Sequence, residues 1–285
     1  MESPVPTSLL DDYAQCEHLA RSHYENFPVA SVLLPAALRP HVAALYAFAR
    51  TADDFADEPL YEGNRLLELD RWEINFRLAL SGKPTHPFCK AFAHSVKIFD
   101  IPPEIPLRLL EAFRMDVKVK RWKDWDELFN YCRHSANPVG RCVLYLSGVR
   151  DERLHLLSDK ICTGLQLINF WQDTSRDLAQ GRIYYPKCEW KNHRVGESLI
   201  LKGRDTDKTR ALVKTVVDKT ETLFWEGEPL LKQTRGRLAL ELKATFGGGL
   251  TILKKIRAQN YGVFERRPSL NAWDKLRIAA KALAG

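Results

Sequence analysis

The stretch 45–57 reads LYAFARTADDFAD, an apolar run with helical spacing that ends in two aspartates, Asp53 and Asp57. Side chains four residues apart lie on one face of a helix, one turn above each other. The stretch therefore predicts a helix whose core-facing stripe leads directly to a pair of carboxylates.

The same arrangement recurs 120 residues later, where 167–179 reads LINFWQDTSRDLA. Its aspartates, Asp173 and Asp177, are again four residues apart after an apolar lead-in. Two like charges at this spacing destabilise an exposed helix by a few tenths of a kcal/mol, so a repeated pair needs a reason.

Helical periodicity extends through most of the chain. Prolines fall between the periodic segments, and alternating apolar patterns bounded by Asn-Gly or Asp-Gly turns are absent from the sequence. We therefore predict an all-α fold of about eight to ten helices, in one domain spanning 1–285, with a polar surface loop or lid at 187–208. The periodic segments are 40–58, 64–80, 105–118, 125–147, 155–180, 206–233, 236–258 and 271–283.

Composition excludes some classes of protein. The 285 residues are 45% hydrophobic and 10% aromatic, which excludes a disordered chain. The net charge of +7 suits an anionic partner, which could be nucleic acid, an acidic membrane surface or a phosphorylated small molecule. Lys and Arg are scattered rather than gathered in one stripe, so we expect no nucleic-acid partner.

Cysteine usage and apolar runs bear on location. The six cysteines form no C-x-x-C pair, which predicts reduced thiols packed in a core, in a reducing compartment. The N-terminal segment carries acids and lacks an apolar h-region, so we expect no signal peptide. No run of about 18 apolar residues occurs, and we expect a cytoplasmic protein without a membrane span.

The residues before the second acid pair indicate a ligand rather than a solvated acidic face. Gln166 and Asn169 precede Asp173 on one helical face, and this stripe begins with the apolar Cys162 and Leu165. A buried ladder of amides and carboxylates needs a ligand that satisfies its polar groups. Mg²⁺ takes oxygen ligands and bridges to phosphate oxygens, so two such pairs predict a clamp for a Mg²⁺-diphosphate complex.

Arginines near the acid pairs suit the remaining phosphate charge. Arg50 lies one turn before Asp53, Arg176 lies beside Asp177, and Arg182 follows shortly after. Arg binds phosphate through paired hydrogen bonds, although any one of these residues alone is equally typical of a surface charge.

Three motifs together resemble the squalene/phytoene synthase family: DDFAD (53–57) with the upstream Arg50, YCRHSANPVG (131–140) and LQLINFWQDTSRDLAQGRIYYP (165–186). The likeness runs from about residue 15 to 270. It implies an all-α isoprenoid-synthase fold with a central cavity, in which two Asp-rich helices hold Mg²⁺ and a prenyl diphosphate. The resemblance assigns the metal to Asp53, Asp57, Asp173 and Asp177, and the substrate to Tyr46, Arg50, Gln166, Asn169, Arg182, Tyr261 and Arg266. Phe27 is a candidate wall residue of the apolar cavity that would enclose the substrate, and it is equally typical of core packing.

Finer features resemble the bacterial branch of this family that makes hydroxysqualene for hopanoid synthesis. They are HYENFPVAS (23–31), SANPVG (135–140) and Gln172, where head-to-head condensing members usually carry Arg. His134 stands where the family usually has a Tyr with a proton-transfer role. It is interpreted either as a base near neutral pH, a role that a pocket water could take instead, or as a helix histidine bonded to a backbone carbonyl.

The resemblance implies conversion of presqualene diphosphate to hydroxysqualene, with Mg²⁺ as the cofactor and water capturing the cation. Capture by hydride would need NADPH, and the sequence has no G-x-G-x-x-G after a strand. Alternatives are a squalene, presqualene diphosphate, phytoene or dehydrosqualene synthase, and a non-enzymatic basic helical module that binds lipid headgroups or nucleic acid.

The C-terminal segment 271–285 is both basic and amphipathic. It is typical either of a helix that lies on a membrane surface or of an ordinary capping helix. Since substrate and product are greasy, the interpretation includes peripheral contact with the inner face of the membrane and hand-over with other hopanoid-pathway enzymes.

Overall fold

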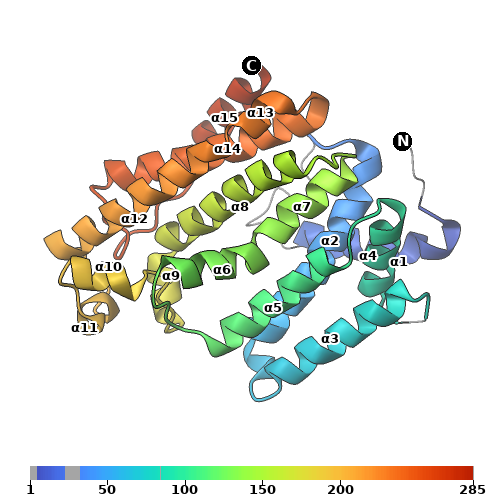
Figure 1. Ribbon diagram of the computed structural model, residues 1–285, viewed down its shortest axis with the longest axis horizontal. Coiled ribbons are helices and arrows are strands. Elements are labelled where there is room, and N and C mark those ends of the chain that lie inside the picture. Colours follow the sequence, from blue (N-terminus) through green and yellow to red (C-terminus); the bar gives the residue numbers. More distant parts are fainter. Residues whose placement is uncertain (1–4, 23–32, 84, 285) are drawn as a thin grey trace. The chain divides into compact units, whose positions relative to one another are not determined.

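The computed structural model describes residues 5–22, 33–83 and 85–284 (Figure 1). The structure is 76% helical, and the described residues form no β-strand. One isolated parallel bridge joins Arg121 and Ile183. The predicted all-α class is therefore confirmed.

The helices divide between two compact units of the chain. The first unit, Met1–Lys118 with Pro138–His155, carries α1 (Leu10–Ser22), α2 (Arg39–Asp57), α3 (Arg65–Leu80), α4 (Pro87–Ile98), α5 (Glu104–Lys118) and nearly all of α7 (Asn137–Leu146). The second unit, Val119–Asn137 with Leu156–Gly285, carries α6 (Trp125–Ser135), most of α8 (Glu152–Gln172), α9 (Thr174–Ala179), α10 (Lys187–Asn192), α11 (Glu197–Leu201), α12 (Asp207–Glu226), α13 (Pro229–Gln233), α14 (Gly236–Ala258) and α15 (Ala272–Ala284). The single domain expected from the sequence stays a prediction.

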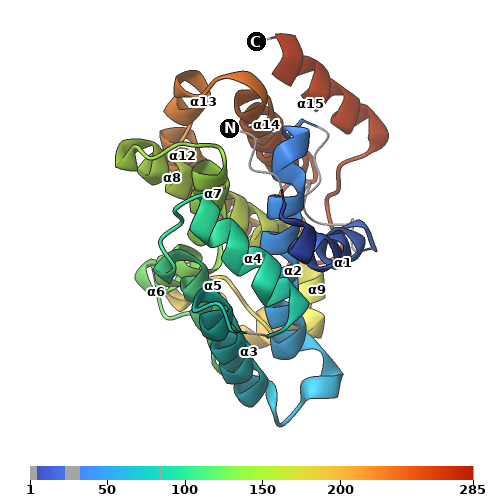
Figure 2. The same ribbon diagram turned by 90° about the vertical axis from the view of Figure 1, so that its right-hand side faces the viewer.

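In the first unit, α2 contacts α1, α3, α4 and α5 (Figure 2). Phe48 of α2 packs against Phe76 and Phe92 with ring centroids 4.6 and 5.0 Å away, and all three side chains are fully buried. The Trp72 indole donates a hydrogen bond to the Phe48 carbonyl at 3.2 Å. These contacts fix the rotation of α2 and so decide which of its faces turns away from the core.

The second unit packs around Trp171 and Phe224, both fully buried. The Trp171 indole donates to the Thr220 hydroxyl at 2.8 Å, which ties α8 to α12. Gly249 lies within α14, and a Cβ there would come within 2.9 Å of the Phe224 ring. Gly249 therefore permits close packing of α14 on α12, and the glycines at 247–249 do not break the helix.

The expected number of helices is too low, because several predicted segments are interrupted. The segment 125–147 breaks at Ala136, whose φ is −112°. The segment 155–180 breaks at Asp173, and 206–233 divides into α12 and α13. Helices of five or six residues, such as α9 and α13, are too short to show a periodic pattern.

The predicted surface loop or lid at 187–208 is wrong as to its structure, because half of this segment lies in two short helices, α10 and α11. Glu189 is buried and accepts a hydrogen bond from the Trp125 indole at 2.7 Å. The Trp190 indole donates to the Tyr185 carbonyl at 2.8 Å, and Ile200 is fully buried. These contacts hold α10 and α11 against the rest of the second unit.

All six cysteines are free thiols. Cys16, Cys89, Cys132 and Cys142 are buried as predicted, whereas two others, Cys162 and Cys188, are half-buried. None of the described helices is long and apolar enough to cross a bilayer.

Candidate active site

One face of α2 carries the first set of predicted site residues. Tyr46, Arg50, Asp53 and Asp57 recur at intervals of three and four residues, and all four side chains are half-buried. The opposite face, which includes Phe48, is buried in the core. The core contacts of α2 therefore place these four functional groups along a single stripe of the helix.

Arg50 balances the charge of the acids that follow it. Its guanidinium is 3.1 Å from an Asp53 carboxylate oxygen and 2.6 Å from one of Asp54. A third carboxylate, that of Glu58, lies 3.9 Å away. Sequence reasoning did not single out Asp54, although its place four residues after Arg50 was a readable signal.

The end of α2 is held in place by a residue from the next long helix. The Arg65 guanidinium donates hydrogen bonds to the carbonyls of Ala56 and Asp57, at 2.8 and 3.3 Å. These carbonyls belong to the last turn, where an α-helix cannot satisfy them internally. The backbone that carries Asp57 is thereby fixed.

Burial raises the pKa of Tyr46 above its usual value, so this phenol keeps its proton at neutral pH.

The second acid pair lies where α8 ends and α9 begins. Asp173 occupies the junction, but the Asp177 amide still donates to the Asp173 carbonyl at 3.0 Å. The two aspartates therefore stay one helical turn apart despite the break. The backbone after them is held too, because the Arg182 amide donates to the Asp177 carbonyl at 2.8 Å.

An arginine distant in sequence reaches Asp173. The Arg267 guanidinium forms an ion pair with the Asp173 carboxylate, and both side chains are largely buried. Beside it, the Gln172 amide donates to the Pro268 carbonyl at 2.8 Å. The segment 259–268, called the C-terminal arm below, is thus attached to the end of α8 by two adjacent contacts.

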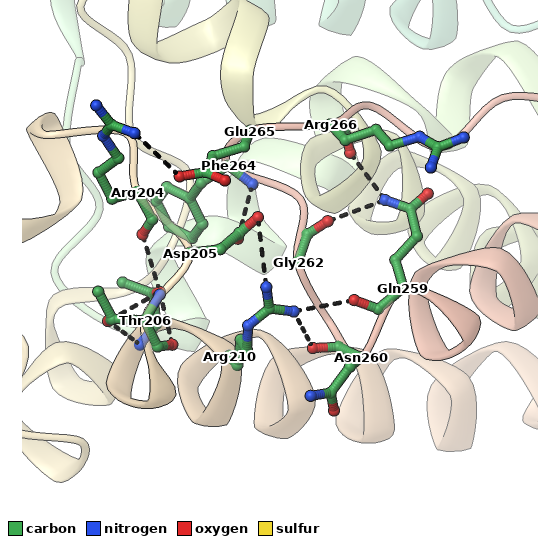
Figure 3. Close-up of polar contacts among 11 residues, drawn as sticks. Arg204, Asp205, Thr206, Arg210, Gln259, Asn260, Gly262, Phe264, Glu265 and Arg266 are labelled. Atoms are coloured by element: carbon green, nitrogen blue, oxygen red, sulfur yellow. Dashed lines mark hydrogen bonds and ion pairs between the residues drawn. The ribbon is translucent and has the colours of Figure 1, made fainter.

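Figure 3 shows how the other end of the C-terminal arm is fixed. The Arg210 guanidinium donates to the carbonyls of Gln259 and Asn260, at 2.9 and 2.7 Å. The Gln259 amide in turn donates to the carbonyls of Gly262 and Arg266, at 2.9 and 3.0 Å. These bonds satisfy the carbonyls at the end of α14 and fold the arm back on itself.

The chain turns sharply within the arm. Asn260 and Tyr261 both have positive φ, at 49° and 57°. At Gly262, a Cβ would lie 2.6 Å from the Arg210 guanidinium and 2.8 Å from an Asp205 carboxylate oxygen, so a larger residue would displace these two side chains. Asp205 also accepts a hydrogen bond from the Phe264 amide at 3.3 Å (Figure 3).

A small pocket of the second unit brings Asp177 and Arg182 together. Two aromatic rings, Phe170 and Tyr184, line the same pocket and stack with centroids 3.7 Å apart. The ring of Tyr131 packs beside this stack, with its centroid 6.0 Å from that of Phe170 and 6.3 Å from that of Tyr184. The pocket therefore combines an acid, a cation and the faces or edges of several aromatic rings.

His134 lies in the last turn of α6 and is half-buried. Its Nδ1 is 2.8 Å from the Asn130 carbonyl. A carbonyl only accepts, so Nδ1 carries the hydrogen, and in the neutral ring Nε2 holds the lone pair. The expected hydrogen bond from His134 to a backbone carbonyl is therefore present. In the neutral ring it leaves Nε2 free to accept a proton.

The buried ladder predicted before Asp173 is not what the structure shows. Asn169 is exposed and Gln166 is half-buried, because their face of α8 turns away from the core around Trp171. Two of the predicted metal acids also have a counter-charge, because Arg50 pairs with Asp53 and Arg267 pairs with Asp173.

The remaining predicted residues lie in different settings. Arg176 and Arg266 are exposed, and Tyr261 is half-buried with the Lys214 ammonium 5.9 Å from its ring centroid. Phe27 lies outside the described residues. Of the two neighbours Arg266 and Arg267, the one that contacts an acid of the predicted site is Arg267, which the sequence analysis did not single out.

Comparison with known proteins identifies the family. The squalene/phytoene synthase model matches residues 20–274. The chain belongs to the squalene/phytoene synthase family. This family acts on prenyl diphosphates, which are small-molecule substrates.

The family relatives include two activities. A hydroxysqualene synthase of Rhodopseudomonas palustris is 37% identical over 223 residues, covering 76% of this chain and 74% of its own. A phytoene synthase of Thermus thermophilus is 30% identical over 279 residues, covering 98% and 94%.

Solved structures confirm the isoprenoid-synthase fold of the family. The squalene synthase HpnC from Alicyclobacillus acidocaldarius superposes with a TM-score of 0.86 at 41% identity, covering 90% of this chain and 97% of its own. A dehydrosqualene synthase gives the same TM-score at 22% identity, which shows the shared fold.

The carboxylate oxygens of the two aspartate pairs are the type of ligand that a hard divalent cation prefers. Mg²⁺ commonly uses one or two protein carboxylates and completes its shell with water and substrate phosphate, so it needs no full protein cage. No group of three or more His, Cys, Asp or Glu among the described residues is arranged to hold a metal alone. Asp53 and Asp173 each have an arginine at a carboxylate oxygen, a place that another cation can take.

Proposed function

We propose that this member of the squalene/phytoene synthase family converts presqualene diphosphate to hydroxysqualene and diphosphate. The observation that carries the proposal is the recurrence of one arrangement in both units: two aspartates one turn apart, with an arginine paired to the first. A diphosphate needs both kinds of group, since acids recruit its metal and arginines bind its oxygens.

The metal acids are proposed to be Asp53, Asp57, Asp173 and Asp177. Mg²⁺ bound there would supply Lewis-acid neutralisation of the charge that builds on the departing diphosphate. Arg50 and Arg182 are proposed to share that charge, and Arg267 joins them because its pairing with Asp173 places it beside the acids.

In the proposed reaction, the bond between the carbinyl carbon and the diphosphate oxygen breaks, and its electron pair leaves with diphosphate. The C30 cation rearranges, and a water oxygen forms the new C–O bond. The water proton then passes to a base, for which His134 Nε2 is suited by its tautomer. Phe170 and Tyr184 line the pocket that holds Asp177 and Arg182, and apolar walls of this kind are proposed to exclude stray water from the cation.

The specific product is proposed because hydroxysqualene synthase relatives reach 37% identity over three quarters of this chain. Phytoene synthesis is the second candidate, because the Thermus enzyme aligns with nearly the whole chain. Family membership removes the support for a non-enzymatic module.

The test is product analysis after incubating the protein with presqualene diphosphate and Mg²⁺, with and without NADPH. We expect hydroxysqualene in both reactions. A squalene product that requires NADPH would overturn water capture. Phytoene from geranylgeranyl diphosphate, or presqualene diphosphate from farnesyl diphosphate, would identify the alternative activities.

A further inference from the structure

The C-terminal helix α15 presents apolar side chains on two opposite faces. Asp274, Ile278 and Ala282 follow one stripe and are half-buried or buried, because α15 packs on α14. Ile278 comes within 3.5 Å of the position that a Cβ on Gly247 would take. The packing of this face on α14 is what a capping helix requires, but it does not explain why the opposite face is apolar.

The opposite face is apolar and faces solvent. Trp273, Leu276 and Leu283 are 75%, 61% and 69% exposed, and Ala280 lies between them on the same stripe. Among the large apolar residues that the structure describes, only Leu60 is more exposed than Trp273. Three of the four most exposed apolar side chains thus share one face of a single helix, where isolated ones would be unremarkable.

The charged side chains that α15 exposes are all positive. Its one acid, Asp274, is turned toward α14, where it pairs with Lys255 at 2.6 Å, and the Asn271 amide donates to it at 2.8 Å. These contacts lower the pKa of Asp274, chiefly through the Lys255 hydrogen bond, and keep the acid ionised and engaged. The cations Lys275, Arg277 and Lys281 are exposed and form no salt bridge with any described residue.

We propose that the solvent-facing side of α15 docks on an anionic lipid bilayer. A Trp and two leucines between cations is the composition of a helix that lies in the headgroup region with its apolar side inserted. Neutralisation of the only acid by Lys255 fits the negative surface of such a bilayer better than it fits a partner protein with mixed charge. The inference does not depend on which reaction the site performs.

The test is co-sedimentation of the full chain with vesicles of phosphatidylcholine alone and of phosphatidylcholine mixed with phosphatidylglycerol. We expect binding to the mixed vesicles, weakened at high salt because surface charges are screened. Each of the three cations should contribute about fivefold to partitioning. The variant Lys275→Gln/Arg277→Gln/Lys281→Gln should therefore lose about a hundredfold.

A second variant separates insertion from charge. Trp273→Ser/Leu276→Ser/Leu283→Ser should lose at least about tenfold in partitioning, because the apolar area that enters the bilayer is removed. Ile278 and Ala282 are untouched, so helicity and melting temperature should match the parent. The control is Leu10→Ser/Leu156→Ser/Leu201→Ser, three leucines that are about half exposed elsewhere and should leave binding unchanged.

Fluorescence provides an independent readout. Mixed vesicles should shift the tryptophan emission to shorter wavelength, and Trp273→Phe should abolish that shift while the other six tryptophans remain. Absence of binding to mixed vesicles, or equal binding by the serine variant and the control, would overturn the proposal. The proposal would also be overturned if sedimentation velocity showed a dimer of the parent protein that the serine variant does not form. A second copy of the chain, and not a bilayer, would then cover the apolar face of α15.

Discussion

The two acid pairs differ in where their balancing charge comes from. Asp53 lies inside an uninterrupted helix, and Arg50 pairs with it from one turn away. Asp173 lies at a helix junction, and Arg267 comes from 94 residues further along the chain. The first pair is complete as soon as α2 forms, whereas the second depends on the C-terminal arm. The difference shows that one arrangement of charges can be built locally or by tertiary structure.

The largest expected effect comes from removing one acid of either pair. Asp53→Asn and Asp173→Asn should each lower turnover of presqualene diphosphate by about 10²–10³, because charge stabilisation of the leaving group is lost. The loss of turnover should far exceed any loss of thermal stability, since both carboxylates remain partly exposed and neither belongs to the apolar core. The control Asp126→Asn alters an exposed acid in the first turn of α6 and should leave turnover unchanged. Equal loss in the control, or normal turnover in either variant, would contradict a role for both pairs.

Two neighbouring arginines test the dependence of the second pair on the arm. Arg267→Gln should lower kcat/KM by about 10–100-fold, the equivalent of a lost charge-assisted hydrogen bond of roughly 1.5–3 kcal/mol. Arg266→Gln removes the same charge one residue earlier, from an exposed side chain, and should cost less than about threefold. If the order of the two variants were reversed, Arg266 would be the functional residue that the resemblance first implied.

The anchor of the arm should affect stability more modestly. Arg210→Ala leaves the carbonyls of Gln259 and Asn260 without their donor, which should lower the free energy of unfolding by about 1–3 kcal/mol. Urea denaturation of the parent and the variant measures this difference in the free energy of unfolding. The control Arg204→Ala removes an exposed arginine that is 3.6 Å from Glu265, a contact worth at most about 1 kcal/mol. Equal effects of both variants would show that the arm is not held by Arg210.

The smallest effect separates the buried thiols from the half-buried ones. Burial raises the pKa of Cys16 and of Cys142 to about 12. Below that pH the thiolate fraction rises tenfold per pH unit, so alkylation of these thiols should be slow at pH 7 and accelerate on going to pH 9. Mass spectrometry should find Cys162 and Cys188 of the second unit labelled first. Early labelling of Cys16 would show that the first unit opens more readily than its packing indicates.

The sequence predicts best the segments over which a helical period repeats many times. The segment 236–258 was predicted with the bounds that α14 has, and α14 is 23 residues long. The helix α4 was missed, although Lys90, His94 and Lys97 recur at helical spacing along it, because its 12 residues repeat the period only about three times. A short helix gives few repeats to count.

The candidate site shows the same limit. The stripe of α2 could be predicted completely, since helical spacing alone aligns Tyr46, Arg50 and Asp53. The choice between Arg266 and Arg267 could not, because it depends on two left-handed residues, Asn260 and Tyr261, that turn the arm. No local pattern in the sequence reports that turn.

The central claim is that both acid pairs act on one diphosphate through bound Mg²⁺. It is tested most directly by calorimetric titration of an unreactive prenyl thiodiphosphate into the parent protein, Asp53→Asn, Asp173→Asn and the double variant, with and without Mg²⁺. The account predicts Mg²⁺-dependent binding that either single variant largely removes, and a double variant that loses little more, because groups that act as a unit are not additive. Losses that add independently, or tight binding without Mg²⁺, would contradict it.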